Sequence, residues 1–382
     1  MKTPLSWLQL THEKMRLLIA LAGIGFADML MFVQLGFKTA LFDSNVKLHH
    51  ALNGDIFFMS PQSDALGFTQ QFSERRLYES LAVEGVDSVV PVYLGLASWK
   101  NPIERNTRTL FVIGFNPKKN ILDLPGVAEN IDQIKLEDAL LFDDQSRAEF
   151  GDIPSLFASG NPVTTELASR KVTVKGLFSL GASFTADGTV LTSDINFLRV
   201  FPERQKGLID LGVVNIKPEA DLQIVVQRLR DKLPQDVEVL SKEEFIQRDI
   251  TYWQNSTAIG FIFTLGTFIG FIVGIVIVYQ ILYTDVADHL PEYATLKAMG
   301  YRDRYFISLV FQEAIILAFV GFLPGLGIAK VLYALTANAT ALPIAMTLNR
   351  AITVLILTLI MCCASGAVAI RKLNAADPAD IF

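Results

Sequence analysis

The sequence predicts a membrane protein with four transmembrane helices and a large α/β domain outside the cytoplasm. Three observations lead to this fold class. The 382 residues are 51% hydrophobic and only 19% charged, which is unusual for a soluble protein of this length. Four segments are apolar over about 20 residues, the length that crosses a bilayer. A segment of about 220 residues with strand and helix patterns separates the first apolar segment from the second.

The four predicted transmembrane helices cover 17–37, 258–283, 305–331 and 351–370. The first is longer than the hydrophobic region of a signal peptide, and no A-x-A site follows it, so we interpret it as an uncleaved span. Pro324 lies inside the third and is expected to kink or break that helix.

Lysine and arginine residues beside the spans predict the orientation of the chain. They precede the first span, lie between the second and third, and follow the fourth, whereas the loop ALTANATALPIAMTLN contains none. The residues concerned are Lys2, Lys14, Arg16, Lys297, Arg302, Arg304, Arg371 and Lys372. We therefore expect both termini, segment 284–304 and the tail 371–382 in the cytoplasm, and domain 38–257 and loop 332–350 in the periplasm.

The domain 38–257 is predicted to contain two lobes. The order strand, helix, strand occurs at both of its ends, over 54–115 and 207–241, which indicates a split β-α-β, ferredoxin-like lobe. The middle, 116–206, is rich in Pro, Gly and short β runs and predicts an inserted, mostly β lobe. The predicted strands are 54–60, 86–99, 108–115, 171–180, 207–217 and 237–241, and the predicted helices are 73–84 and 221–233.

Helices are also expected beside the spans. Residues 1–16 have an apolar side and charges at the end, which indicates an interfacial helix on the cytoplasmic surface. Segments 38–52 and 241–254 are expected to continue the first two spans as a two-helix stalk. The S-x-x-E spacing of Ser241 and Glu244 is that of a capping box, which predicts a helix start at Ser241.

Small residues mark two of the predicted spans. Glycines four positions apart let helix backbones approach closely, so we expect a tight seam within or between subunits, although glycine is common in membrane helices generally. These glycines are Gly266, Gly270 and Gly274 in the second span and Gly321 and Gly325 in the third.

Asp28 and Glu313 are acids inside predicted spans, where such residues are functional candidates by default. We favour structural roles, because no partner cation is visible in the spans and a proton relay would need a chain of such groups. Asp28 is expected to bond a neighbouring helix, and Glu313 to extend toward the cytoplasmic surface.

Several functions are excluded. A net charge of −6 leaves no basic footprint for nucleic acid. Cys362 and Cys363 are adjacent in an apolar run and predict no disulfide, and the four histidines show no metal-ligand spacing. No P-loop, H-E-x-x-H, G-x-S-x-G or C-x-x-C motif occurs, so we predict no catalytic, cofactor-binding or metal site. Any nucleotide energy must come from another subunit.

The stretch HLPEYATLKAMGYRDRY, 289–305, predicts a short amphipathic helix that starts near Pro291 and ends at Gly300. Its residues Glu292, Leu296, Lys297, Ala298 and Gly300 resemble the pattern that follows the second span in the MacB/FtsX superfamily, the type VII ABC permeases. The tail AADPADIF and the order of one span, a large domain and three spans are also similar. Within that family the sequence DVADHLPEYATLKAMGY is most similar to that of the cyanobacterial DevC-type permeases.

The resemblance implies a non-catalytic permease subunit of an ABC-type mechanotransmission exporter in the bacterial inner membrane. It implies a homodimer, a separate ABC ATPase that binds ATP and magnesium, a periplasmic adaptor and a TolC-like outer-membrane channel, with lobes like those called Porter and Sabre. Segment 284–304 would be the coupling helix that docks on the ATPase. Its docking residues would be Glu292, Leu296, Lys297, Met299, Gly300, Arg302 and Arg304.

Alternatives remain at this level. The expected cargo is glycolipid, with peptide and other amphiphiles open. One alternative is an FtsX-like scaffold that activates a cell-wall hydrolase, but FtsX-type external domains are small, whereas this one has room for two lobes, which favours export. A lipoprotein-releasing permease shares this topology and is harder to exclude. In the lipid-handling functions, substrate would enter sideways between spans one and two of the two subunits. The coupling helix could instead lie on lipid headgroups, although Asp285, Asp288 and Glu292 disfavour anionic lipid.

Overall fold

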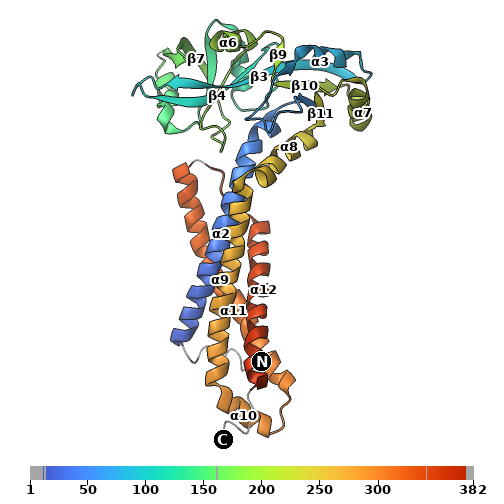
Figure 1. Cartoon of the computed structure of the whole chain (residues 1–382). Helices are drawn as coiled ribbons and strands as arrows, with labels where there is room; N and C mark the ends of the chain where they lie inside the picture. The colour runs from blue at the N-terminus through green and yellow to red at the C-terminus, as the bar shows by residue number, and fades with distance from the viewer. Residues whose placement is uncertain (1–11, 13, 161, 341, 376–382) are drawn as a thin grey trace. The chain divides into compact units, whose positions relative to one another are not determined.

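The computed structural model describes residues 12, 14–160, 162–340 and 342–375 (Figure 1). The chain divides into two compact units. The helical unit comprises Met1–Ala40 and Ala258–Phe382, and the α/β unit comprises Leu41–Thr257. The predicted interfacial helix 1–16 lies largely outside the described residues, as does the tail after 375.

Long helices build the helical unit. They are α2 (Lys14–Ala51), of which the part up to residue 40 belongs here, α9 (Ala258–Asp288), α11 (Asp303–Thr340) and α12 (Leu348–Ala375), with the short α10 (Leu290–Ala298) between α9 and α11. In the described part of the chain, four helices are long and apolar enough to cross a membrane: Lys14–Ala51, Ala258–Asp288, Arg304–Thr340 and Leu348–Ile370.

The third long helix extends further than its sequence pattern predicts. It continues through Pro324 to Thr340, so the expected kink does not end it and most of the predicted loop 332–350 is helical. Residues 332–340 contain neither Gly nor Pro and are rich in alanine, which favours the helix. Only the short segment 342–347 is described as non-helical before α12 begins.

One nine-stranded sheet organises the α/β unit, in the order β11-β1-β10-β3-β4-β8-β5-β7-β6. At one end, β10 (Leu211–Ile216) lies between β1 (Ile56–Met59) and β3 (Val86–Lys100), the two strands that α3 (Glu74–Glu79) connects. The helix α7 (Leu222–Lys232) connects β10 to β11 (Glu238–Ser241). This is the strand order of a split β-α-β unit, with antiparallel neighbours throughout.

The predicted inserted lobe shares one sheet with the predicted ferredoxin-like lobe. Its strands extend the same sheet, and β6 returns to pair with β3 at Trp99 and Leu167. At 15 residues, β3 is long enough to belong to both ends of the sheet. The strands are β4 (Thr107–Phe115), β5 (Ala139–Asp143), β6 (Val163–Leu167), β7 (Arg170–Phe178) and β8 (Thr189–Ser193).

Short helices and one small second sheet complete this unit. The helices are α4 (Val127–Asn130), α5 (Ile153–Ala158) and α6 (Asp194–Val200), with 3₁₀ turns at Ser80–Ala82, Ile131–Lys135 and Ala148–Phe150. The predicted strand 207–217 is divided, because Asp210 separates β9 (Leu208–Ile209) from β10, and β9 pairs with β2 (Phe72–Ser73).

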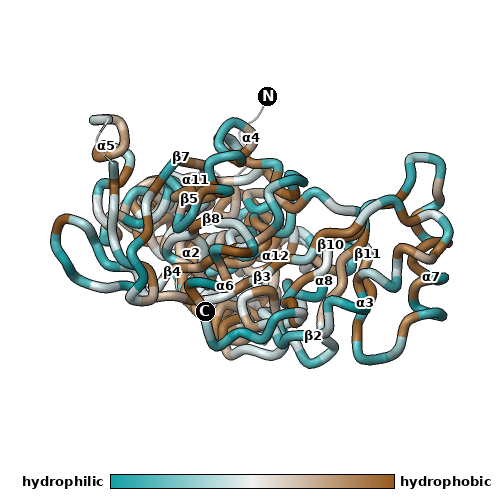
Figure 2. Tube along the Cα trace, turned by 90° about the horizontal axis from the view of Figure 1, so that it is seen from above, coloured by the Kyte–Doolittle hydropathy of each residue, from teal (hydrophilic) through white to brown (hydrophobic). Residues whose placement is uncertain are grey.

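Both faces of the sheet carry an apolar core, as alternate side chains of β1 show. Phe58 packs in one cluster with Leu77 of α3 and Leu229 of α7. Phe57 packs in the opposite cluster with Phe245 and with residues from the end of α2. In Figure 2 the strands β10 and β11 are coloured mainly as hydrophobic, whereas α7 alternates between hydrophobic and hydrophilic residues.

The predicted stalk helices form with one interruption. The helix α8 (Lys242–Thr251) begins with the predicted capping box: Ser241 Oγ accepts the Glu244 N–H at 3.3 Å, and Glu244 Oε2 accepts the Ser241 N–H at 2.8 Å. A π-helical turn, Tyr252–Ser256, follows, and Thr257 is extended, so α8 and α9 are two helices. In contrast, α2 is continuous to Ala51.

Candidate functional site

The short helix α10 lies between the two long helices α9 and α11. Pro291 occupies its first turn, where a missing N–H is tolerated. At its other end Gly300 has φ +99°, its N–H donates to the Lys297 carbonyl at 3.0 Å, and the Tyr301 N–H donates to the Leu296 carbonyl at 3.2 Å. These two bonds form a Schellman motif, so the helix ends where the sequence predicts.

One side of α10 packs into the helical unit. Tyr293 and Ala294 are buried, and the Tyr293 ring centroid lies 5.4 Å from that of Phe306 in α11. Leu296 is half-buried against the same apolar cluster, so only part of its side chain faces solvent. Its helical position, one turn after Tyr293, explains this orientation.

The opposite side of α10 and the turn after it are open to solvent. Met299 is 65% exposed and carries the main apolar surface there. The other exposed docking candidates are Glu292, Lys297, Gly300, Arg302 and Arg304. Lys297, Arg302 and Arg304 supply cations here beside the acid Glu292, and Asp303 stands between the two arginines in the sequence.

A cluster of polar side chains, here called the polar anchor, lies at the base of α10. Arg16 of α2 forms ion pairs with Asp285, at 3.6 Å, and with Asp288 of α9. His289 Nδ1 lies 3.0 Å from the Asp285 carbonyl oxygen. Glu313 of α11 is fully buried, and its carboxyl group lies beside that of Asp285. The polar anchor therefore joins three long helices to the start of α10.

Two sequence-based expectations change in the polar anchor. Glu313 is 0% exposed and does not extend to the surface. Asp285 and Asp288, which were expected to disfavour anionic lipid together with Glu292, form ion pairs with Arg16 of α2. Arg16 and Asp288 are 272 positions apart, so no local sequence pattern predicts that they pair. The one signal in the sequence is that Arg16 precedes the first predicted span and Asp288 follows the second.

The two glycine rows face α2 of the same chain. A Cβ on Gly266 would meet Gln34, and one on Gly270 would lie 3.4 Å from Leu30. One on Gly274 would meet Met361 of α12 first and would lie 3.0 Å from Ala27 of α2. Gly321 and Gly325 of α11 meet Ile24 and Gly25. The helix α2 thus packs against α9 and α11, and the structure places both rows within one subunit.

Asp28 bridges helices rather than standing alone. Its side chain is fully buried, and Oδ1 accepts a hydrogen bond from Thr358 Oγ1 of α12 at 2.6 Å. Its Cβ also lies against Gly325. This geometry supports the structural role expected for Asp28, although it does not bring Asp28 into the polar anchor.

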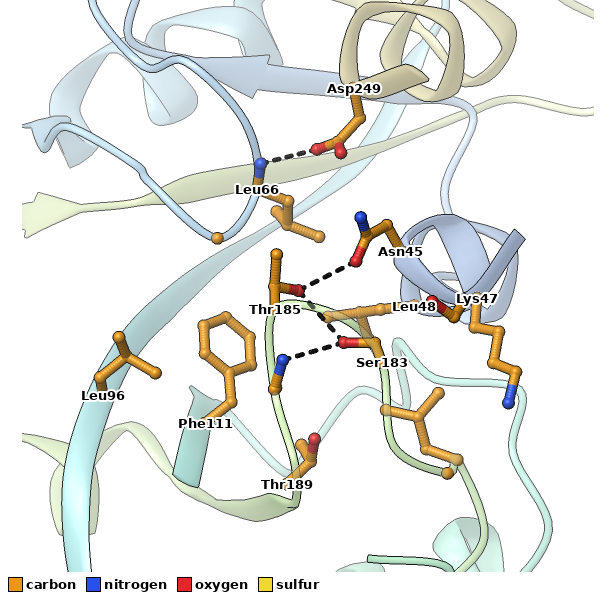
Figure 3. Close-up of a pocket in the computed structure, with 15 residues that line it drawn as sticks. Asn45, Lys47, Leu48, Leu66, Leu96, Phe111, Ser183, Thr185, Thr189 and Asp249 are labelled. Carbon is orange, nitrogen blue, oxygen red and sulfur yellow. Dashed lines mark hydrogen bonds between the residues drawn. The ribbon is translucent and has the colours of Figure 1, made fainter. Parts of the chain in front are cut away.

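The α/β unit contains a small cavity beside the end of α2 (Figure 3). About 40 Å³ is open to the centres of water-sized molecules, which is room for a few waters and not for a lipid chain. Two hydrogen bonds connect the residues that line it. Thr185 Oγ1 donates to Asn45 Oδ1 at 3.3 Å, and the Leu66 N–H donates to Asp249 Oδ2 at 2.8 Å. His49 Nε2 of α2 lies 3.2 Å from the same Asp249 oxygen of α8.

Comparisons with known proteins agree with a permease. Residues 251–378, about a third of the chain, match the family model described as FtsX-like permease C-terminal. This part of the chain is therefore similar to the C-terminal part of FtsX-like permeases. No curated protein matches the chain.

Two solved structures are similar to parts of the chain. One is the periplasmic region of MacB from Actinobacillus actinomycetemcomitans, at 12% identity and a TM-score of 0.37, covering 52% of this chain and 92% of that one. The other is the extracellular domain of the ABC-type transporter YknZ from Gram-positive bacteria, at 15% identity and a TM-score of 0.34, covering 50% of this chain and 100% of that one.

Proposed function

We propose that this chain is the non-catalytic transmembrane subunit of an ABC-type exporter that is driven by an ATPase on a separate chain. The match of residues 251–378 to the FtsX-like permease C-terminal model carries this proposal, since that range includes α9, α10, α11 and α12. ATP and magnesium would bind the ATPase.

In this proposal α10 is the segment that docks on the ATPase. Its exposed surface combines one large apolar side chain, Met299, with the cations Lys297, Arg302 and Arg304. A helix that lays an apolar residue into a groove with a charged rim is a common mode of recognition. The long stem of Met also adapts to irregular grooves.

The attachments of α10 suit it to transmit force. Tyr293 and Leu296 fix it to α11 through apolar packing, and the polar anchor fixes its start to α2, α9 and α11. Packed elements move as rigid bodies, so a push on α10 would displace the ends of these helices together. The helix α2 then continues without a break as far as Ala51 in the α/β unit.

The remaining features of the proposal come from the resemblance of 292–305 to DevC-type permeases. They are a homodimer, cytoplasmic termini, a periplasmic α/β unit, a periplasmic adaptor, a TolC-like outer-membrane channel and glycolipid as cargo. Expulsion of cargo by movement of the α/β units would make the chain a mechanotransmission subunit with no catalytic residue of its own.

Purification of the tagged chain from native membranes, followed by mass spectrometry, tests the proposal. We expect an ABC ATPase to co-purify with the wild type and to be lost from Met299→Asp and Arg302→Glu variants. Both residues are exposed, so the permease itself should remain folded. The variant Leu296→Asp is a poor test, because Leu296 is half-buried and its replacement would disturb α10 itself.

Ile195→Asp is the matched control for Met299→Asp. Ile195 lies in α6 and is 64% exposed, close to the exposure of Met299. This variant should keep the ATPase. Equal recovery of the ATPase with Met299→Asp and Ile195→Asp would contradict docking through α10, and absence of any ABC ATPase from the wild-type preparation would contradict the exporter.

A further inference from the structure

Glu313, in the polar anchor, is a buried acid without a hydrogen-bond donor. Its side chain in α11 is 0% exposed, and no other glutamate whose side chain the structure describes is buried. Among the described residues, none donates an N–H or O–H to either of its carboxyl oxygens. An ionised carboxylate in such a place would lose its hydration without any replacement, which is strongly unfavourable.

The group next to Glu313 is a second acid. Its carboxyl group lies beside that of Asp285 of α9, which is 4% exposed. Arg16 of α2 lies on the other side of this pair, with its Nη1 at 3.6 Å from Asp285 Oδ1. Two negative charges repel strongly in a buried site, and two carboxyl groups at one site therefore share a proton. The site thus holds two acids and one guanidinium.

The other charged and titratable side chains of the polar anchor come from α9 and α10. Asp288 pairs with Arg16 and is 49% exposed. His289 Nδ1 lies 3.8 Å from Asp285 Oδ1, and the hydroxyl of Tyr293 is buried. The helix α12 has no charged residue between 351 and 370. The cations of the described residues therefore pair with Asp285 and Asp288, and none of them pairs with Glu313.

We propose that Glu313 carries a proton and donates it in a hydrogen bond to the carboxylate of Asp285, so that the two acids hold one negative charge, which Arg16 balances. A carboxylic acid supplies one O–H donor, which a carboxylate lacks, and a hydrogen bond to an ionised acceptor is a strong one. The site thus binds a proton between α9 and α11, at the base of α10. This inference rests on contacts within the helical unit and does not depend on export or on an ATPase.

Loss of this proton would change the packing of α9 against α11. A second negative charge would appear where no described group donates to it, and the two carboxylates would repel each other. The two helices would then separate locally or admit water to the site. Because the same groups fix the start of α10, its attachment would become weaker as the site loses its proton.

Infrared spectroscopy of the purified full-length protein tests the proposal. A protonated carboxyl group has a C=O stretching band that a carboxylate lacks, and carbon-13 in the side-chain carboxyl group of glutamate moves this band to lower frequency. At pH 7.5 we expect the wild type to show a protonated-carboxyl band that moves with labelled glutamate and is lost in Glu313→Gln. Glu292→Gln is the control and should keep the band, because Glu292 is exposed.

Two outcomes would overturn the proposal. If no protonated-carboxyl band of the wild type moves with labelled glutamate, Glu313 is ionised. If such a band persists in Glu313→Gln, another glutamate holds the proton. The labelled wild type needs no substitution, so the first outcome can be observed even where Glu313→Gln folds poorly.

The pH dependence of stability is a second measurement. Near neutral pH only the unfolded chain would release this proton, so the wild type should lose stability relative to Glu313→Gln as pH rises from 5 to 8. Glutamine keeps the shape of the protonated acid and a donor toward Asp285, and Asp143 contributes equally to both proteins. A difference between the two unfolding midpoints that stays constant over this range would contradict a proton bound at Glu313.

Discussion

Gly25 of α2 and Gly325 of α11 approach so closely that a Cβ on Gly25 would lie 3.3 Å from the backbone nitrogen of Gly325. A Cβ on Gly325 would be closer still to the opposite backbone, at 3.0 Å from the Gly25 carbonyl oxygen. The two helices therefore meet backbone to backbone. Contacts of this kind hold membrane helices together where the hydrophobic effect gives no drive for association.

Gly325→Ala should destabilise the helical unit. The new methyl group would press on the backbone of α2, which cannot move aside as a flexible side chain can. Overpacking of this kind costs about 1–3 kcal/mol, which is more than the ~1 kcal/mol that alanine gains over glycine in a helix. Thermal unfolding of the purified protein in detergent should show a lower midpoint.

Gly327→Ala is the control for this prediction. Gly327 lies two residues further along α11, and a Cβ there would meet nothing within 4 Å. Its substitution should be neutral or slightly stabilising. Equal midpoints for the two variants would show that the close contact of α2 and α11 is absent from the protein in solution.

The hydrogen bond between Thr358 and Asp28 gives a second prediction. Thr358→Val has nearly the same shape but removes the donor to Asp28 Oδ1, which is fully buried. A buried acceptor without its partner costs about 1–3 kcal/mol, so the unfolding midpoint should fall. Thr353→Val, at an exposed site of the same helix where the hydroxyl bonds only the Asn349 carbonyl, should change little. Similar losses at both sites would argue against a structural role for Asp28.

Much of the fold follows from the sequence because its patterns are local. Apolar runs of membrane length predict the long helices, and the capping box at Ser241 predicts the start of α8. The pairing of β6 with β3 could not be predicted, because it joins Trp99 and Leu167, which lie far apart in sequence, and no local pattern reports it. The length of α11 was underestimated because hydropathy falls before the helix ends.

The candidate site was predictable in its position but not in its contacts. Residues around Gly300 indicate a helix between two spans, and its end follows from a glycine with positive φ. The orientation of Leu296 toward α11 depends on how α10 packs, and the pairing of Arg16 with Asp285 depends on how three helices meet. Both contacts depend on tertiary packing, and the pattern of apolar residues over the nine residues of α10 is too short to predict them.

Asp143 predicts how the stability of the α/β unit depends on pH. Its buried carboxylate accepts N–H bonds from Gln145, Leu180 and Gly181, yet burial outweighs these bonds and raises its pKa above the ordinary 3.8. The folded state therefore binds the proton more tightly than the unfolded state between 3.8 and the raised pKa. Over this window the contribution of Asp143 to stability falls as pH rises.

Asp143→Asn should remove this dependence. Thermal unfolding from pH 4 to pH 7 should show the stability of the wild type, relative to the variant, decreasing as pH rises. Asp132→Asn is the control, because Asp132 is 76% exposed, and it should leave the slope of the wild type unchanged. A constant difference between the wild type and Asp143→Asn across this range would contradict the raised pKa.

Gly300→Ala should loosen the C-terminal turn of α10. Gly300 has φ +99°, which an alanine adopts only at a cost of about 1–2 kcal/mol, and the Schellman bonds to Lys297 and Leu296 depend on that conformation. Amides around 296–302 should exchange hydrogen several-fold faster, while the rest of the chain is unaffected. Gly300→Asn should show a smaller change, since asparagine tolerates positive φ, and Thr295→Ala on the exposed side of α10 should show none. Unchanged exchange in Gly300→Ala would mean that this turn is not what ends the helix.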